Sequence, residues 1–241
     1  MKKPAFDRLA ETYDKDIQSV TSFSGHSIDY FREYKIKEIH RVLKENSMKH
    51  PRTILDFGCG IGSLSPYIRK YFPDAEIYGL DISSESISIA KEKQKAYNIN
   101  YAIFDSLISG GVNFPFDVEE FDLVILSCVL HHIPEREQLN TLSFLQSVMN
   151  QESLLFIFEL NPYNPLMRLV FRKYDRKEDE NAEFIYPGKL KQQMKKCSLN
   201  VLEHNYTLFF PGLLSVFVPL EVYLKRIPFG AQYYIMASRL I

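Results

Sequence analysis

The chain has 241 residues, of which 46% are hydrophobic and 24% are charged, and its formal net charge is −1. This composition gives a globular protein enough apolar side chains for a full core, and it excludes a disordered or collagen-like chain. It also lacks the basic footprint of a nucleic-acid-binding protein, so we expect no nucleic-acid partner.

The first 50 residues show two helical patterns of apolar side chains. The first pattern comprises Phe6, Leu9, Ala10 and Tyr13, and the second comprises Ile28, Phe31, Ile36, Ile39 and Leu43. Side chains three or four positions apart lie on one face of a helix. We therefore predict an N-terminal helical segment that precedes the first strand.

An apolar strand then runs directly into a glycine-rich turn. Residues 53–57 are Thr-Ile-Leu-Asp-Phe, and Gly58-Cys59-Gly60-Ile61-Gly62 follows. An unbroken apolar run is typical of a buried parallel strand, and closely spaced glycines are needed where the backbone turns sharply beside a ligand. Asp56 is unusual here, because a buried carboxylate is costly unless another group binds it.

A second carboxylate ends the next predicted strand, residues 76–82. Asp81 follows the glycine-rich turn by roughly 20 residues, the separation at which nucleoside-binding sheets place a carboxylate against ribose hydroxyls. A dinucleotide site expects Gly-x-Gly-x-x-Gly, whereas the spacing here is Gly-x-Gly-x-Gly. An acidic residue two positions before the first glycine would also repel a pyrophosphate and attract a cationic amino-acid group.

The turn and its flanking residues resemble the first motif of the class I S-adenosylmethionine-dependent methyltransferases. The resemblance implies that S-adenosylmethionine is the cofactor and S-adenosylhomocysteine the product. It also implies that Asp56 and the glycine loop hold the methionine part, and that Asp81 binds the ribose diol through charge-assisted hydrogen bonds. The cofactor-binding residues expected in this part of the chain are Asp56, Gly58, Cys59, Gly60, Gly62, Asp81 and Ile82.

Residues 5–14 resemble the N-terminal segment of small-molecule methyltransferases, including those that act on quinone precursors. The resemblance implies a lid helix that folds over the cofactor, with Tyr13 near it. An aromatic side chain that only packs the helix on the sheet would produce the same pattern.

A helix over residues 85–97 and a third strand over residues 100–106 follow the second strand. This third strand ends in Phe104 and Asp105. The resemblance implies that Asp105 meets the adenine amino group and that Phe104 lies against the ring. A plain loop aspartate is the alternative.

A fourth strand, residues 123–126, delivers Ser127 to His132 to the crevice where open α/β sheets bind ligands. The resemblance implies a cofactor contact for Ser127. His131 or His132 is the candidate catalytic base, because histidine accepts a proton near neutral pH, although the dipeptide could only shape the turn. Adjacent histidines point in different directions, so a metal site built from them and Glu159 is disfavoured and we expect no metal.

A helix over residues 135–150 and a fifth strand over 153–160 continue a regular alternation. This alternation predicts a Rossmann-like, doubly wound, mostly parallel α/β sheet. The resemblance implies seven strands with an antiparallel C-terminal edge strand and N-terminal lid helices. We predict a helical lid over residues 1–50 and a methyltransferase domain over 51–241, with a substrate-side cap at 161–230.

The last third of the chain is its basic part. Residues 161–241 carry 12 Lys and Arg against 7 Asp and Glu, whereas residues 1–160 carry 17 against 23. Helices are expected over residues 166–180 and 187–196, and strands over 199–210 and 232–240. Three polar residues after the fifth strand could contact the methyl acceptor or simply form a turn, namely Glu159, Asn161 and Asn164.

An apolar run over residues 206–220 lies among these basic residues. One hypothesis for this run is a lipid-like or aromatic acceptor, or weak contact with an anionic membrane surface. A strand with a packed cap, or a contact in a homodimer, is the alternative.

Three widely spaced cysteines, Cys59, Cys128 and Cys197, predict free thiols in a reducing compartment. Residues 1–10 are too polar for a secretory signal, and the apolar run over residues 208–220 is too short to span a bilayer. We therefore expect a cytoplasmic protein.

The predicted function is S-adenosylmethionine-dependent methyl transfer to a small-molecule acceptor that is lipid-like, aromatic or a glycan precursor. Two alternatives remain. One is a non-catalytic regulatory subunit that binds S-adenosylmethionine. The other is an NAD-dependent oxidoreductase, which the glycine spacing and Asp56 disfavour.

Overall fold

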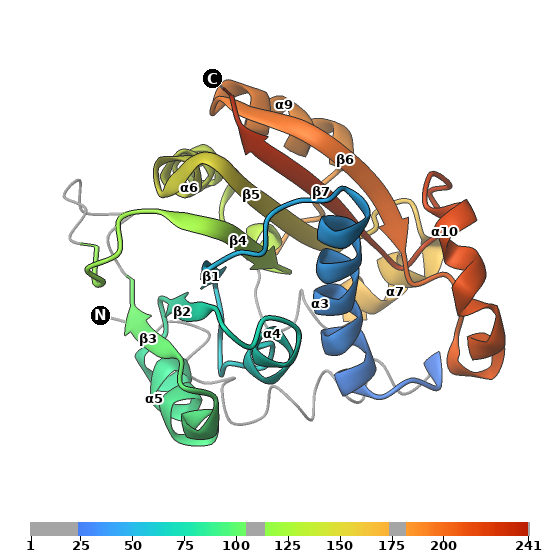
Figure 1. The fold of residues 1–241 in the computed structure, drawn as a ribbon. Helices are drawn as coiled ribbons and strands as arrows, with labels where there is room; N and C mark the ends of the chain where they lie inside the picture. Colours follow the sequence, from blue (N-terminus) through green and yellow to red (C-terminus); the bar gives the residue numbers. More distant parts are fainter. Residues whose placement is uncertain (1–23, 105–113, 174–181, 241) are drawn as a thin grey trace.

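The computed structural model describes residues 24–104, 114–173 and 182–240, and its centre is a seven-stranded sheet (Figure 1). The strand order is β3-β2-β1-β4-β5-β7-β6. β7 runs antiparallel to both of its neighbours, whereas the other pairings are parallel. The predicted fold class is confirmed, except that the antiparallel C-terminal strand β7 lies between β5 and β6 and not at the edge of the sheet. The strands are β1 (Thr53–Phe57), β2 (Glu76–Asp81), β3 (Asn100–Ile103), β4 (Phe121–Ser127), β5 (Met149–Leu160), β6 (Leu199–Thr207) and β7 (Gln232–Arg239).

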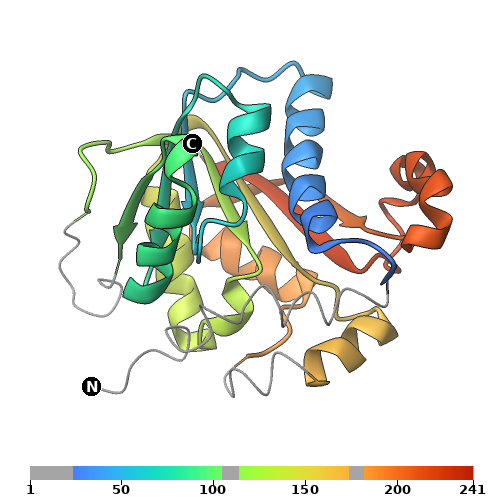
Figure 2. The same ribbon diagram turned by 90° about the horizontal axis from the view of Figure 1, so that it is seen from below.

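Helices cover both faces of this sheet, as Figure 2 shows from below. The longer ones are α3 (Ile28–Glu45), α4 (Ser65–Tyr71), α5 (Ser84–Lys93), α6 (Glu135–Ser147), α7 (Pro165–Lys173) and α9 (Pro187–Lys196). α3 and α4 share one buried cluster with β1 and β5, α6 and α9 share a second, and α5 packs in a smaller third cluster. The central strands are therefore buried on both sides, which is why their sequences are nearly continuous apolar runs.

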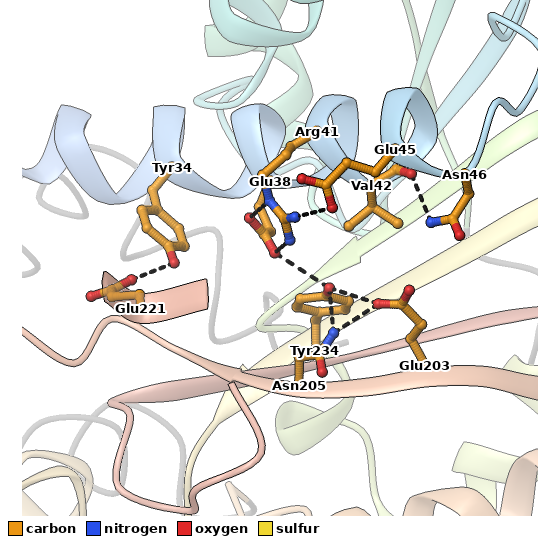
Figure 3. Close-up of polar contacts among 10 residues, drawn as sticks. All are labelled: Tyr34, Glu38, Arg41, Val42, Glu45, Asn46, Glu203, Asn205, Glu221 and Tyr234. Carbon is orange, nitrogen blue, oxygen red and sulfur yellow. Dashed lines mark hydrogen bonds and ion pairs between the residues drawn. The ribbon is translucent and has the colours of Figure 1, made fainter. Parts of the chain in front are cut away.

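Polar contacts fix α3 on the sheet near its open edge (Figure 3). Glu38 accepts a hydrogen bond from the Tyr234 hydroxyl at 3.3 Å and pairs with Arg41 at 2.5 Å. The same hydroxyl also lies 3.1 Å from a carboxylate oxygen of Glu203 in β6, so the two carboxylates share its one proton. One turn earlier, the Tyr34 hydroxyl donates to Glu221 at 2.6 Å. α3 is thus tied to β6, β7 and the segment between them.

The segment that joins β6 to β7 lies at the carboxyl edge of the parallel strands. Thr207 and Leu160, the last residues of β6 and β5, both lie opposite Gln232, the first residue of β7. The predicted strand over residues 199–210 ends at Thr207, and Pro211 precedes a 3-10 helix, η4 (Gly212–Leu220), and a short helix, α10 (Glu221–Leu224). Whatever binds at this edge lies on the same side as this segment.

The remaining elements are short 3-10 turns, η2 (Lys95–Tyr97) and η3 (Leu130–His132). The predicted helix over residues 85–97 ends at Lys93 and continues as η2, which stops where Asn98 adopts φ +51°. No helix within the described ranges is both long and apolar enough to span a bilayer.

Candidate active site

The carboxyl ends of four neighbouring strands bring acidic and polar side chains to one edge of the sheet. Asp56 and Asp81 come from β1 and β2, Ser127 ends β4, and Glu159 is near the end of β5. Because these strands are parallel and paired in register, residues far apart in the sequence meet here. This is the crevice in which open α/β sheets bind ligands.

The glycine loop after β1 has a backbone that side chains would disfavour. Gly58, Gly60 and Gly62 have φ values of +74°, +53° and +74°. A Cβ atom on Gly58 would lie 2.4 Å from Val129 Cγ2, whereas one on Gly60 would meet no atom within 4 Å. Gly60 therefore faces open space at the crevice, and the loop can admit a ligand close to its backbone.

Asp56 is buried and incompletely hydrogen-bonded. Its exposed fraction is 2%, and Oδ2 accepts no hydrogen bond from any residue that the structure describes. Burial, and after it the nearby charge of Asp81, raise the pKa of Asp56 to about 7 against a smaller lowering by Lys35. A buried, unsatisfied carboxyl oxygen of this kind is an acceptor for an incoming donor or cation.

Asp81 is held by backbone amides on either side of the crevice. Its Oδ2 accepts from Gly60 N at 2.8 Å, and Oδ1 accepts from Ser83 N at 2.9 Å. The adjacent Ile82 side chain is half exposed, whereas the Phe104 side chain is buried. The backbone N–H of Phe104 donates to the backbone carbonyl of Asp81 at 2.9 Å. Asp81 thus connects the glycine loop to the start of α5.

Cys59 lies beneath the loop and is buried. Burial raises the pKa of its thiol well above the ordinary value, and the charges of Asp56 and Asp81 act in the same direction. The thiol therefore stays protonated near neutral pH and packs as a small apolar side chain. Gly79 leaves room for it, because a Cβ there would lie 3.0 Å from the Cys59 sulfur.

A buried lysine from α3 also reaches the crevice. Lys35 Nζ donates to Ser127 Oγ at 2.7 Å and lies 3.5 Å from Cys128 Sγ. Its residue is only 9% exposed. Our sequence analysis missed Lys35, although it stands between Phe31 and Ile39 on the apolar stripe of its helix, and a cation in such a stripe is a signal.

His131 and Glu159 form a buried pair at the other side of the crevice. His131 Nδ1 lies 2.6 Å from Glu159 Oε2, and their side chains are 3% and 1% exposed. The second carboxylate oxygen accepts from Leu130 N at 2.9 Å. A carboxylate that accepts from Nδ1 fixes the ring orientation and assigns proton exchange to Nε2.

Aromatic side chains surround this pair. The His132 ring lies against His131 at 4.0 Å between centroids, and the Phe171 ring of α7 is 5.8 Å from His131. Phe171 in turn stacks on Phe184 at 4.1 Å. The wall next to the dyad is therefore apolar.

Asn161 and Asn164, two of the candidate acceptor contacts, have structural partners. Asn161 Nδ2 donates to the carbonyls of Pro228 and Gly230, at 3.0 and 2.7 Å. Asn164 Oδ1 accepts from the N–H groups of Leu166 and Met167 and so caps α7.

The candidate residues Tyr13 and Asp105 lie outside the described residues. Among residues 24–104, 114–173 and 182–240, no three His, Cys, Asp or Glu side chains are grouped so that they could hold a metal ion.

Comparison with protein families agrees with this geometry. Residues 54–152, which include β1, the glycine loop and β4, match the family model described as a methyltransferase domain. Over these residues the chain carries a methyltransferase domain, and the findings support the class I S-adenosylmethionine-dependent type. S-adenosylmethionine is its cofactor, in agreement with the sequence prediction.

Two curated relatives illustrate the range of this similarity. The methyltransferase is 26% identical over 159 residues to a demethylmenaquinone methyltransferase of Thermotoga maritima, covering 66% of this chain and 61% of the relative. It is 24% identical over 207 residues to a ubiquinone biosynthesis O-methyltransferase of Coxiella burnetii, covering 78% and 84%. The chain thus spans less than two thirds of the Thermotoga relative.

Solved structures share the fold of this methyltransferase. Magnesium protoporphyrin IX methyltransferase from Synechocystis with bound SAH superposes with a TM-score of 0.59 at 18% identity, covering 92% of this chain and 87% of that one. A TehB-like SAM-dependent methyltransferase from Corynebacterium glutamicum gives a TM-score of 0.60 at 15% identity, covering 95% and 97%.

The described residues fit the cofactor of this methyltransferase. An unsatisfied carboxyl oxygen on Asp56 suits an ammonium group, and the open space beside Gly60 suits a ligand that lies against the backbone. Lys35 adds a cation at the same edge, which suits the carboxylate that the cofactor carries.

Proposed function

We propose that the protein transfers a methyl group from S-adenosylmethionine to a hydroxyl, or another weakly acidic group, of a small and largely apolar aromatic acceptor. The observation that carries this proposal is the buried His131–Glu159 pair at the crevice. A base held in this way is suited to take a proton that leaves the acceptor.

Asp56, Asp81 and the glycine loop would hold the cofactor. Asp56 would pair with its ammonium group, Asp81 would accept from the ribose hydroxyls, and Lys35 would bind its carboxylate. S-adenosylmethionine supplies an electrophilic methyl group on its sulfonium. The protein's main task is to align the acceptor with that group, and alignment can account for roughly 7 to 11 kcal/mol of the barrier.

His131 would remove the proton from the acceptor. Glu159 keeps a proton on Nδ1 and stabilises the imidazolium that forms when Nε2 accepts a second one. A positioned base typically contributes about 10² to 10⁴ in rate, so loss of His131 should slow transfer without abolishing cofactor binding.

The aromatic wall supports an apolar aromatic acceptor. Phe171 is 3% exposed and stacks on Phe184, so the surface that faces His131 offers ring contacts rather than hydrogen bonds. Two relatives carry names that place them in quinone pathways, which agrees with an aromatic or quinol-like acceptor.

The test is a turnover assay with hydroxylated aromatic acceptors of increasing lipophilicity. His131→Ala should lower kcat by about 10² to 10⁴ while the Kd for S-adenosylmethionine stays within about twofold. Glu159→Gln should move the acidic limb of the pH–rate profile to lower pH, because the imidazolium loses its carboxylate. His50→Ala, on an exposed histidine, is the matched control.

Two outcomes would overturn the proposal. Wild-type rates in both His131→Ala and Glu159→Gln would remove the base from the mechanism. Tight binding of S-adenosylmethionine with no turnover across the panel would indicate the regulatory subunit, and binding of NAD instead would indicate the oxidoreductase.

A further inference from the structure

The segment between β6 and β7 exposes large apolar side chains at the open edge of the sheet. Leu213 is 95% exposed, Tyr223 81%, Val216 76% and Phe229 70%. These are the four most exposed large hydrophobic side chains among the described residues, and we call them the apolar ridge. Single exposed apolar residues are ordinary, but a group of them within 17 residues indicates an interaction surface.

The local backbone explains why the ridge is not buried. η4 contains Pro219 and a non-helical Leu214, and none of its residues is buried. A 3-10 helix stacks positions i and i+3 and offers no broad face to pack. The segment is nevertheless anchored, because His26 Nε2 lies 3.2 Å from Phe210 O and the Tyr34 hydroxyl donates to Glu221.

The outward charge of this segment is positive. Residues 208–231 contain one acidic residue, Glu221, and two basic ones, Lys225 and Arg226. Glu221 is 6% exposed, and its carboxylate accepts from the Tyr34 hydroxyl at 2.6 Å and from Phe209 N at 2.7 Å. Its negative charge is therefore turned inward, while Arg226 is exposed.

α7 extends this surface with the same chemistry. Asn164 Nδ2 donates to Phe229 O at 2.8 Å, which places the start of α7 beside the ridge. Leu166 and Leu169 are 47% and 63% exposed. Residues 161–173 contain no acidic residue and three basic ones, Arg168, Arg172 and Lys173.

The surface also lies on the side of the molecule where the acceptor must enter. Thr207 and Leu160 end their strands opposite Gln232, so the ridge and α7 both leave the sheet at its carboxyl edge. Figure 1 and Figure 2 both show α7 and the η4–α10 segment projecting on this side. Phe171 on α7 is the same residue that lies 5.8 Å from His131.

We propose that the apolar ridge docks this protein on the surface of an anionic phospholipid bilayer. Apolar side chains enter the boundary of the acyl chains, and the basic residues beside them pair with the anionic headgroups. A second copy of the chain fits less well. A two-fold contact through this surface would bring arginines and lysines together with no exposed acidic residue in either segment to pair with them.

The test is co-sedimentation of the full chain with vesicles, without cofactor or acceptor, so that its result does not depend on methyl transfer. Vesicles of phosphatidylcholine and phosphatidylglycerol in a two-to-one ratio should bind the protein at low ionic strength. Vesicles of phosphatidylcholine alone should bind it at least about tenfold more weakly, and high salt should release it.

Two pairs of variants separate the apolar from the electrostatic contribution. Leu213→Ser with Val216→Ser should weaken vesicle binding at least about tenfold, whereas Leu202→Ser with Leu240→Ser, at exposed positions elsewhere, should not. Lys225→Glu with Arg226→Glu should weaken binding to anionic vesicles, whereas the same charge change at Lys195 and Lys196 should leave most of it. Circular dichroism and calorimetry with S-adenosylmethionine confirm that each variant is folded.

Three outcomes would overturn the proposal. The first is failure of the folded wild-type protein to bind anionic vesicles at low ionic strength. The second is equal loss of binding in the ridge variant and in its control. The third is a wild-type dimer in light scattering that Leu213→Ser with Val216→Ser dissociates, without vesicle binding, which would identify a second copy as the occupant.

Discussion

Three carboxylates lie at the ends of neighbouring strands, and their surroundings give them different chemistry. Asp56 is buried with an unsatisfied oxygen, Asp81 accepts from two backbone amides, and Glu159 is paired with His131. Asp56 is therefore costly in the ligand-free protein and suited to a cation, whereas both oxygens of Glu159 already have hydrogen-bond partners. In our proposal the same chemical group, a carboxylate, thus serves binding, orientation and proton transfer at one edge.

The stability of the ligand-free protein should depend on pH through Asp56. Its pKa is raised from 3.8 to about 7, so the folded state binds a proton that the unfolded chain has already lost. The contribution of Asp56 to the free energy of unfolding should consequently be most favourable below about pH 4, fall as pH rises towards 7, and level off above it. Asp56→Asn cannot ionise and should be more stable than wild type at pH 8, by up to about 4 kcal/mol.

Urea unfolding without cofactor, between pH 4 and 8, measures this difference. The two proteins should converge towards pH 4. Asp74→Asn, at an exposed position, should follow the wild-type profile throughout. If the free energy of unfolding depends on pH in the same way in wild type and in Asp56→Asn, the raised pKa of Asp56 is contradicted. The same substitution should weaken binding of S-adenosylmethionine at pH 8, because the carboxylate would no longer meet an ammonium group.

At the scale of elements, α3 presents one cation to the crevice and another to solvent. Lys35 is buried against Ser127, while Lys37, half a turn further on, is exposed. The helix is held in this orientation by Glu38 and Tyr34, which contact β7 and α10 (Figure 3). The charge that reaches the crevice is thus set by the rotation of a whole helix.

Lys35→Met should weaken binding of S-adenosylmethionine about tenfold, which corresponds to about 1.4 kcal/mol, and leave the folded structure intact. Methionine keeps the apolar stem and removes only the charge. Lys37→Met is the matched control, since it removes the same charge from the same helix on its exposed side. Isothermal calorimetry would measure the affinity of each variant for S-adenosylmethionine. Equal affinities for Lys35→Met and Lys37→Met would remove Lys35 from the site.

Several helices and strands could be predicted from local patterns in the sequence, whereas the contacts between them could not. The apolar runs of β1, β4 and β5 and the periodicity of α3 predicted the sheet and its helices, because burial on both faces leaves a direct mark on composition. The pairing of His131 with Glu159 requires β4 and β5 to be neighbours in register, which no single segment encodes. Lys35 likewise reaches Ser127 only through the packing of α3 on the sheet.

The segment after β6 shows a second limit of sequence patterns. Residues 206–220 are apolar enough for a strand with a packed cap, yet Pro211, Pro219 and the chain's return to β7 place them outside the core as η4. Hydropathy measures the tendency of a side chain to leave water. It does not indicate whether that side chain is buried in the protein's own core or at the surface of another molecule. Only the arrangement around the sheet edge distinguishes the two.

For the whole molecule, one edge of the sheet collects the cofactor site, the histidine base and the apolar ridge. The glycine loop comes from the acidic first part of the chain, whereas α7 and the ridge come from the basic last third. This division lets the two ligands approach from different sides. In our proposal the cofactor binds against the backbone of β1 and β2, and the acceptor approaches from the side of α7 and His131.

Because the cofactor site joins β1, β2, β4 and α3, S-adenosylmethionine should stabilise the fold as a unit. At a concentration of 100 times its Kd, a ligand that binds only the folded state adds about 2.7 kcal/mol, which for a chain of this size raises Tm by about 5–10 °C. Asp81→Asn should lose most of that increase while its ligand-free Tm stays near wild type. NAD should give no increase in either protein, because a pyrophosphate would face Asp56 at the glycine loop. Differential scanning fluorimetry with S-adenosylmethionine and with NAD tests this directly. A larger rise in Tm with NAD would contradict the site as we assign it.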